Sequence, residues 1–177
     1  MGQIFESPVS AVHVTAALLA LVFGTYVWLQ PKGTRRHRQL GYAYVGCMVV
    51  LLITAFRIYH LFGRFGIVHW GAVGASLSLL VGVGSVVLRW PGGSWQQAHY
   101  FGMGGSLTAL YTTLVVESTY RLFPTPYFWW TTVGTGSVLI ALGVGRLWQH
   151  RPVPPARFRP PAGPSSIRTQ PVPTYDG

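Results

Sequence analysis

Five long apolar runs follow one another along the chain, and short polar segments separate them. Each run is close to the length of about 20 residues that a helix needs to cross a bilayer. The separating segments contain glycine, proline or both, which end helices. Because the apolar residues are continuous and do not alternate with polar ones, helices are expected and barrel strands are not. The pattern predicts an all-α integral membrane bundle of five transmembrane helices, at about residues 9–29, 40–61, 66–88, 97–120 and 128–148.

The end of the chain has a different composition. Residues 149–177 are rich in proline and arginine and show no apolar periodicity. Such a segment is typical of an extended, polyproline-like chain. We therefore divide the chain into a transmembrane helical domain, 1–148, and a Pro-rich basic tail, 149–177.

Composition indicates a membrane protein and argues against a soluble domain and a nucleic-acid-binding protein. The chain is 50% hydrophobic and 9% charged, whereas soluble domains carry about 25% charged residues. Its net charge is +10, but the basic residues lie between and after the apolar runs, so a nucleic-acid partner is not expected. The N-terminal residues lack a basic segment and include Glu6, so we expect the first run to stay as an anchor and not to be a cleaved signal peptide.

The basic residues are distributed unequally between the two sides of the predicted bundle. The N-terminal side has three, and the other side has ten: Lys32, Arg35, Arg36, Arg38, Arg89, Arg146, Arg151, Arg157, Arg159 and Arg168. Cytoplasmic loops carry an excess of Lys and Arg. The N-terminus is therefore predicted outside and the C-terminal tail in the cytoplasm, with the basic residues near anionic lipid.

Four histidines stand near the starts of four successive predicted helices: His13, His37, His69 and His99. Ionisable residues at membrane depth are costly and usually functional. In an up-and-down bundle the helix starts alternate sides, which pairs His13 with His69 near the outer side and His37 with His99 near the cytoplasmic side. Each pair suits the two axial positions of a haem iron. No C-x-x-C-H motif is present, so one or two non-covalent b haems are expected.

Simpler interpretations of these histidines remain open. A histidine near a helix end can bond to lipid headgroups or backbone carbonyls without any cofactor. A single haem on the outer side is another alternative, with His37 merely part of a basic loop. His150, at the start of the tail, is expected to be solvated.

The segments that carry these histidines resemble a family of uncharacterised bacterial membrane proteins, classed as a domain of unknown function. They are SAVHVTAALLALVFG, KGTRRHRQLGYAY, FGIVHWGAVGASLSLLVG and QQAHYFGMGGSLTALYTTLVVESTYR. The resemblance covers about residues 9–121, and its most specific part is the K-G-T-x-x-H-R-x-L-G-x-x-Y block. It implies a place in the bacterial inner membrane and carries no established activity.

The order of the histidines is also distantly similar to the transmembrane di-haem cytochrome b family that passes electrons from ascorbate to ferric iron or monodehydroascorbate. That resemblance implies axial ligands paired first with third and second with fourth. Two departures are evident. His37 is expected at the edge of its helix, in a basic loop, and the substrate motifs of that family are not recognisable.

One acidic residue, Glu117, lies inside an apolar run. Arg57 and Arg121 are predicted near the same level, so an ion pair with Glu117 is expected. A proton-coupled quinone pocket or a His/Glu metal site, formed with His13, His60 or His69, is the alternative.

Three functions follow from these patterns. The first is a haem-binding, b-type cytochrome-like membrane protein that carries electrons between a quinol or small reductant and an acceptor. The second is a non-catalytic subunit that scaffolds a respiratory or photosynthetic complex through its helices and tail. The third, a transporter or assembly factor for a metal or haem, has the least support, because no inverted repeat or broken helix is evident.

Overall fold

A computed structural model describes residues 8–58, 66–88, 94–120, 127 and 129–152. The regular elements in this part of the chain are helices, and these residues include no strand. In chain order they are α1 (Pro8–Leu29), α2 (Arg35–Arg57), α3 (Ile67–Val87), α4 (Ser94–Tyr120), the π-helical turn η5 (Trp130–Gly134) and α5 (Thr135–Gln149). The prediction of an all-α fold is confirmed. The predicted tail from residue 153 onward lies outside the described residues.

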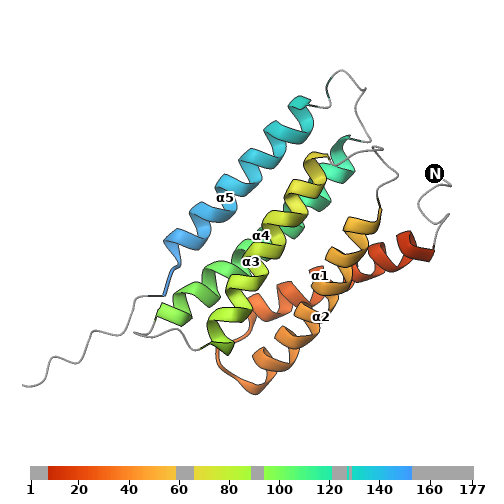
Figure 1. Cartoon of the computed structure of the whole chain (residues 1–177). Coiled ribbons are helices and arrows are strands. Elements are labelled where there is room, and N and C mark those ends of the chain that lie inside the picture. The colour runs from red at the N-terminus through yellow and green to blue at the C-terminus, as the bar shows by residue number, and fades with distance from the viewer. Residues whose placement is uncertain (1–7, 59–65, 89–93, 121–126, 128, 153–177) are drawn as a thin grey trace, which may run out of the picture.

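The helices pack as two hairpins and one added helix (Figure 1). α1 packs mainly on α2, α3 packs mainly on α4, and α5 covers α4. Smaller contacts of α2 with α3 and of α1 with α4 join the two hairpins. Helices α2 to α5 run along a similar direction in the figure, and α1 crosses them obliquely. The ends of α1, α3 and α5 therefore lie at the same end of the molecule as the starts of α2 and α4.

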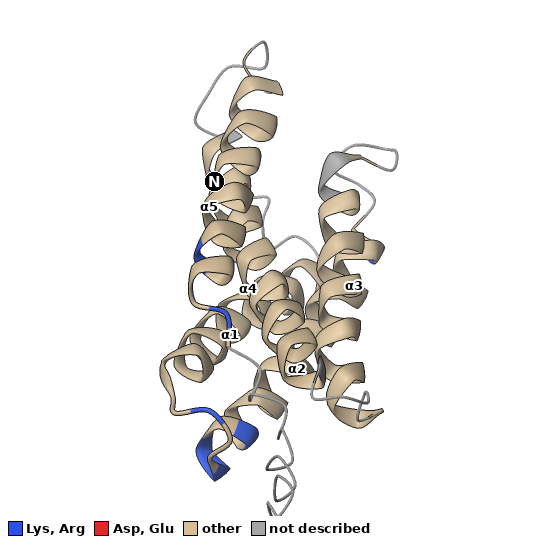
Figure 2. Ribbon diagram, turned by 90° about the vertical axis from the view of Figure 1, so that its left-hand side faces the viewer, with Lys and Arg blue, Asp and Glu red and all other residues tan. Residues whose placement is uncertain are grey.

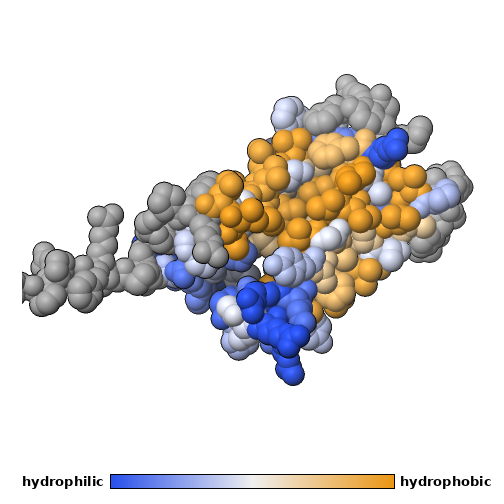
Figure 3. Space-filling model, turned by 60° about the horizontal axis from the view of Figure 1, so that its bottom comes forward, coloured by the Kyte–Doolittle hydropathy of each residue, from blue (hydrophilic) through white to orange (hydrophobic). Residues whose placement is uncertain are grey.

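In the part of the chain that the structure describes, three helices are long and apolar enough to cross a membrane: α1, α2 and the segment His69–Val87 of α3. α4 is longer but includes several Gln, Ser and Thr residues, which lower its hydropathy. α5 has fifteen residues and directly follows the π-helical turn of five residues, so the two form one continuous helical segment. Large apolar side chains cover much of the outer surface, including Leu29, Leu80 and Trp130, and Figure 3 shows this surface in orange. Such exposure is typical of helices that face lipid.

The core lies between the two hairpins, and small residues on α1 form one wall. Ala16, Ala20 and Gly24 are buried at intervals of four residues, so they share one helix face and allow close approach of α2. The ring of Tyr44 packs against Gly24. Its hydroxyl lies 2.8 Å from Ser106 Oγ, which ties α2 to α4 inside the core.

The turn between α1 and α2 explains the K-G-T part of the sequence motif. Lys32 Nζ donates to the Trp28 carbonyl at 2.6 Å and so caps the end of α1. Gly33 has φ +80°, a conformation that favours glycine. Thr34 is the N-cap of α2, and its hydroxyl accepts from the backbone N–H of His37 at 3.1 Å.

Two predicted helix starts were wrong, and the Thr34 cap explains the first of them. The second helix begins at Arg35, not at residue 40, because the Thr34 cap allows polar residues to form its first turn. His37 is therefore helical and does not lie in a loop. α4 begins at Ser94, not at residue 97, which places His99 in its second turn.

Replacement of Thr34 by alanine is expected to lower the free energy of unfolding by about 1 kcal/mol, because the backbone N–H of His37 loses its acceptor. Thermal unfolding in detergent would measure this change. Thr15→Ala is the matched control, since Thr15 lies inside α1 and bonds only to the Ala11 carbonyl of its own helix. Equal stability of both variants would contradict the capping role.

Candidate functional site

The starts of α2 and α4 bring two of the four predicted histidines together. The ring centroids of His37 and His99 lie 6.4 Å apart, and the ring planes make an angle of 74°. His37 is held in place by the Thr34 cap of α2, and His99 projects from the second turn of α4. The pairing expected at the cytoplasmic side thus corresponds to a close contact in the structure.

The His99 ring has a defined hydrogen-bonding partner. Its Nδ1 atom lies 2.8 Å from the carbonyl oxygen of Gly82 on α3. A carbonyl only accepts, so Nδ1 carries the proton and Nε2 keeps its lone pair. Histidines that bind metals almost always donate their other ring N–H to a carbonyl or carboxylate in this way. His99 is therefore in the protonation state that a metal ligand needs.

His37 has one ring nitrogen whose bonding is incomplete. Its Nδ1 atom is buried and has no hydrogen-bond partner among the described residues. A buried polar atom without a partner is costly, so a ligand bound at this atom would be stabilising.

The spacing of the two rings fits two axial ligands of one metal ion. Imidazole nitrogens bind first-row metals at about 2 Å, so rings on opposite sides of one iron have centres about 6 Å apart. The observed 6.4 Å agrees with this value. Gly41, one turn after His37 on α2, has open space where a side chain would lie. Gly24 and Gly104, by contrast, lie in close contact with side chains of neighbouring helices.

Basic residues surround this pair. Lys32, Arg35, Arg36 and Arg38 are exposed beside His37. Figure 2 shows them together at the turn between α1 and α2, and Figure 3 shows a blue patch beside the apolar helix surface. Partial burial lowers the pKa of the Lys32 ammonium. The patch can hold anionic groups next to the histidines.

Aromatic side chains form a wall at the same end. Trp28 packs on Tyr100 with ring centres 5.5 Å apart, and Phe101 packs on Trp148 at 6.0 Å. The guanidinium of Arg151 stacks on Trp148 at 4.5 Å from the ring centre. Trp and Tyr collect at membrane interfaces, so this wall is consistent with an interfacial level for the histidine pair.

In the predicted outer pair, His13 and His69, each ring bonds to a partner of its own. His13 Nδ1 lies 2.9 Å from the Thr54 hydroxyl, which itself donates to carbonyls of its own helix. His13 is therefore held by α2. Figure 1 shows the end of α2 between the start of α1 and the start of α3.

The protonation of His69 also opposes a role as an iron ligand. Its Nδ1 accepts the backbone N–H of Gly66 at 3.2 Å, which caps the start of α3. Nε2 must then carry the proton of the neutral ring. With Nδ1 occupied and Nε2 protonated, His69 has no lone pair to offer a metal. The outer haem pair stays a prediction, and the cap at Gly66 is the observation against it.

The other predicted site residues are only partly described. Glu117 lies half-buried near the end of α4, and Arg57 ends α2. Arg121 and His60 lie outside the described residues, so the ion pair with Glu117 stays a prediction. Within the described ranges, no group of three or more His, Cys, Asp or Glu side chains is placed to hold a metal ion. His150 follows the last turn of α5, where its backbone N–H bonds to the Arg146 carbonyl.

Sequence reasoning missed two parts of the candidate site. The Gly82 carbonyl, which orients His99, belongs to the backbone and leaves no sequence signal. The Thr34 cap was signalled by Thr in the K-G-T-x-x-H motif, three residues before the histidine.

Comparisons with protein-family models, with curated proteins and with solved structures found no match to this chain. The resemblance to an uncharacterised bacterial family therefore stays a prediction. Function is inferred from the geometry of the site alone.

Proposed function

We propose that this protein binds one haem b per chain between His37 and His99 and carries electrons in a membrane. The observation that supports it is the ring pair at 6.4 Å, with the bond from His99 to Gly82 leaving a lone pair on Nε2. One or two haems were expected from the sequence. One is proposed here because His69 uses Nδ1 to cap its own helix.

Several residues around the histidine pair would contribute to haem binding. His37 and His99 would hold the haem iron. Arg35, Arg36 and Arg38 are exposed beside His37 and supply cations for the haem carboxylates. When bound, the haem supplies one-electron chemistry. The carbonyl of Gly82 would fix the orientation of the His99 ring and strengthen it as a ligand.

We further propose that α4 and α5 also cross the membrane, completing a bundle of five transmembrane helices. α4 packs along α3, which is long and apolar enough to cross, and α5 packs along α4. At the end with the histidine pair lie Lys32, Arg35, Arg36, Arg38, Arg146 and Arg151, and Arg57 lies at the other end. Because Lys and Arg favour the cytoplasmic side, the histidine pair would face the cytoplasm and the N-terminus the outside.

A reduced-minus-oxidised visible spectrum of the purified protein, with haem measured per chain, tests this proposal. The expected result is about one low-spin b haem per chain. Two haems per chain would instead support His13 and His69 as ligands of a second haem. No haem after expression with ample haem supply would overturn the proposal and favour the alternative, a non-catalytic subunit of a larger respiratory or photosynthetic complex.

A further inference from the structure

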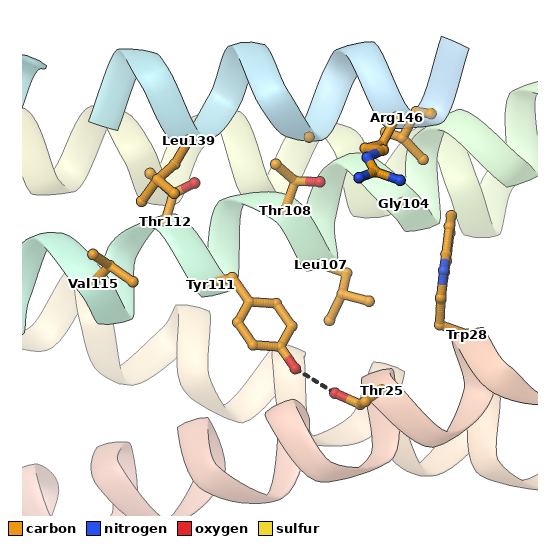
Figure 4. Close-up of a pocket in the computed structure, with 12 residues that line it drawn as sticks. Thr25, Trp28, Gly104, Leu107, Thr108, Tyr111, Thr112, Val115, Leu139 and Arg146 are labelled. Carbon is orange, nitrogen blue, oxygen red and sulfur yellow. Dashed lines mark hydrogen bonds between the residues drawn. The ribbon is translucent and has the colours of Figure 1, made fainter. Parts of the chain in front are cut away.

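A second site lies away from the histidine pair, in a slot between α1, α4 and α5. The slot has a volume of about 440 Å³, within the range of about 300–1,000 Å³ that small-molecule sites occupy. Along α4 its lining extends from Gly104 to Val115, which is about three helical turns. Leu107, Leu139 and Leu147 make most of the wall apolar. Figure 4 shows the slot running along α4.

Hydroxyl groups interrupt this apolar wall halfway along. Thr25 on α1 and Tyr111 on α4 bond to each other at 2.5 Å and close the α1 side. Thr108 and Thr112 project between α4 and α5 in Figure 4. They are one turn apart, so their side chains are spaced by about 5–6 Å.

Thr112 is the slot residue whose hydroxyl group still needs a hydrogen-bond partner. Its side chain is 8% exposed, and its hydroxyl oxygen is buried with no hydrogen-bond partner among the described residues. A threonine inside a helix ordinarily bonds to a carbonyl of the preceding turn, as Thr25 and Thr119 do here. A buried hydroxyl without a partner is costly, and a ligand that accepts its hydrogen bond would remove that cost.

The charge of the slot selects the chemistry of the ligand. Among the described residues that line it, one is a cation, Arg146 in the last turn of α5, and none is a carboxylate. Arginine donates and cannot accept hydrogen bonds. A ligand with an apolar body and oxygen acceptors at two depths fits this arrangement.

We propose that the slot binds the head of an isoprenoid quinone. Its two ring oxygens lie on opposite sides of a six-membered ring, a span comparable to the spacing of Thr108 and Thr112 along the helix. A phospholipid chain fits less well, because its acceptors are confined to the headgroup and would leave Thr112 without a partner. A role of the quinone as redox partner of the haem rests on the proposed function. Binding of the quinone in the slot does not depend on it.

Quinone binding is measured by quenching of tryptophan fluorescence, since Trp28 lines the slot. The full chain in quinone-free nanodiscs is titrated with a benzoquinone that carries two isoprene units. Saturable quenching at one quinone per chain is expected. Thr112→Val keeps the shape and removes the hydroxyl, so it should weaken binding about fivefold to tenfold. Arg146→Gln should also weaken binding.

Two matched controls separate the slot from general partitioning into the bilayer. Thr119→Val removes a hydroxyl from the same helix outside the slot, and Arg151→Gln removes a cation that stacks on Trp148. Both should bind like the wild type. Equal binding by Thr112→Val, quenching that does not saturate, or a co-purified phospholipid that quinone fails to displace would each overturn the proposal. Haem content, measured in the same samples, shows separately whether the histidine site is occupied.

Discussion

Replacement of His99 by alanine is expected to reduce haem content to less than about a tenth of the wild-type value, since the iron would lose one of two axial ligands. His37→Ala should have the same effect, because its ring lies 6.4 Å from the ring of His99. The measurement is haem per chain after purification, together with the low-spin bands of the reduced spectrum. Free imidazole should partly restore a low-spin spectrum in either variant.

His13 and His69 provide matched controls for this experiment. Each is a histidine near a helix start, but one bonds to Thr54 and the other caps α3 at Gly66. His13→Ala and His69→Ala should keep haem at the wild-type level, although His69→Ala should lower stability through loss of its cap. Haem loss in these variants with retention in His37→Ala would reverse the assignment of the ligand pair.

The closest approach of two helices predicts the largest effect on stability. A Cβ atom at Gly102 on α4 would collide with the backbone of Gly82 and with the Ser78 carbonyl, 2.7 Å away. Backbone atoms cannot move aside as a flexible side chain can. Gly102→Ala should therefore force α3 and α4 apart and lower the free energy of unfolding by about 1–3 kcal/mol or more. Thermal unfolding in detergent would measure the change.

This substitution should also affect haem, because the Gly82 carbonyl that it displaces is the acceptor for His99. Loss of such an orienting bond typically weakens metal binding about 10-fold to 100-fold. Gly84→Ala is the control, since a Cβ atom there meets nothing within 4 Å. It should be neutral or slightly stabilising. If both variants had the same stability, the close contact of α3 and α4 would be refuted.

The hydropathy pattern predicted where the helices lie but not where each one begins. The apolar runs located every described helix, because burial in lipid requires long continuous apolar segments. They placed the start of α2 several residues late, because Arg35 and Arg36 are polar yet helical behind the Thr34 cap. A cap is a local hydrogen bond, and a hydropathy pattern does not contain it.

The candidate site was also only partly predictable. The alternation of helix starts correctly placed His37 and His99 at one level, since antiparallel neighbours bring every second start to the same end. The same alternation gave no reason to prefer His37 and His99 over His13 and His69 as ligands. The difference arises from which atom meets each ring nitrogen: a carbonyl for His99 and a backbone N–H for His69.

By itself, the sequence determined the all-helical class, the apolar segments and the concentration of Lys and Arg at one end, because these depend on composition along the chain. Only the tertiary structure decided which histidine keeps a lone pair, where Thr112 lacks a hydrogen-bond partner and where a slot remains between α1, α4 and α5. Those features depend on contacts between helices distant in sequence. Such contacts are set by close packing at residues such as Gly82 and Gly102, which hydropathy does not distinguish from other glycines.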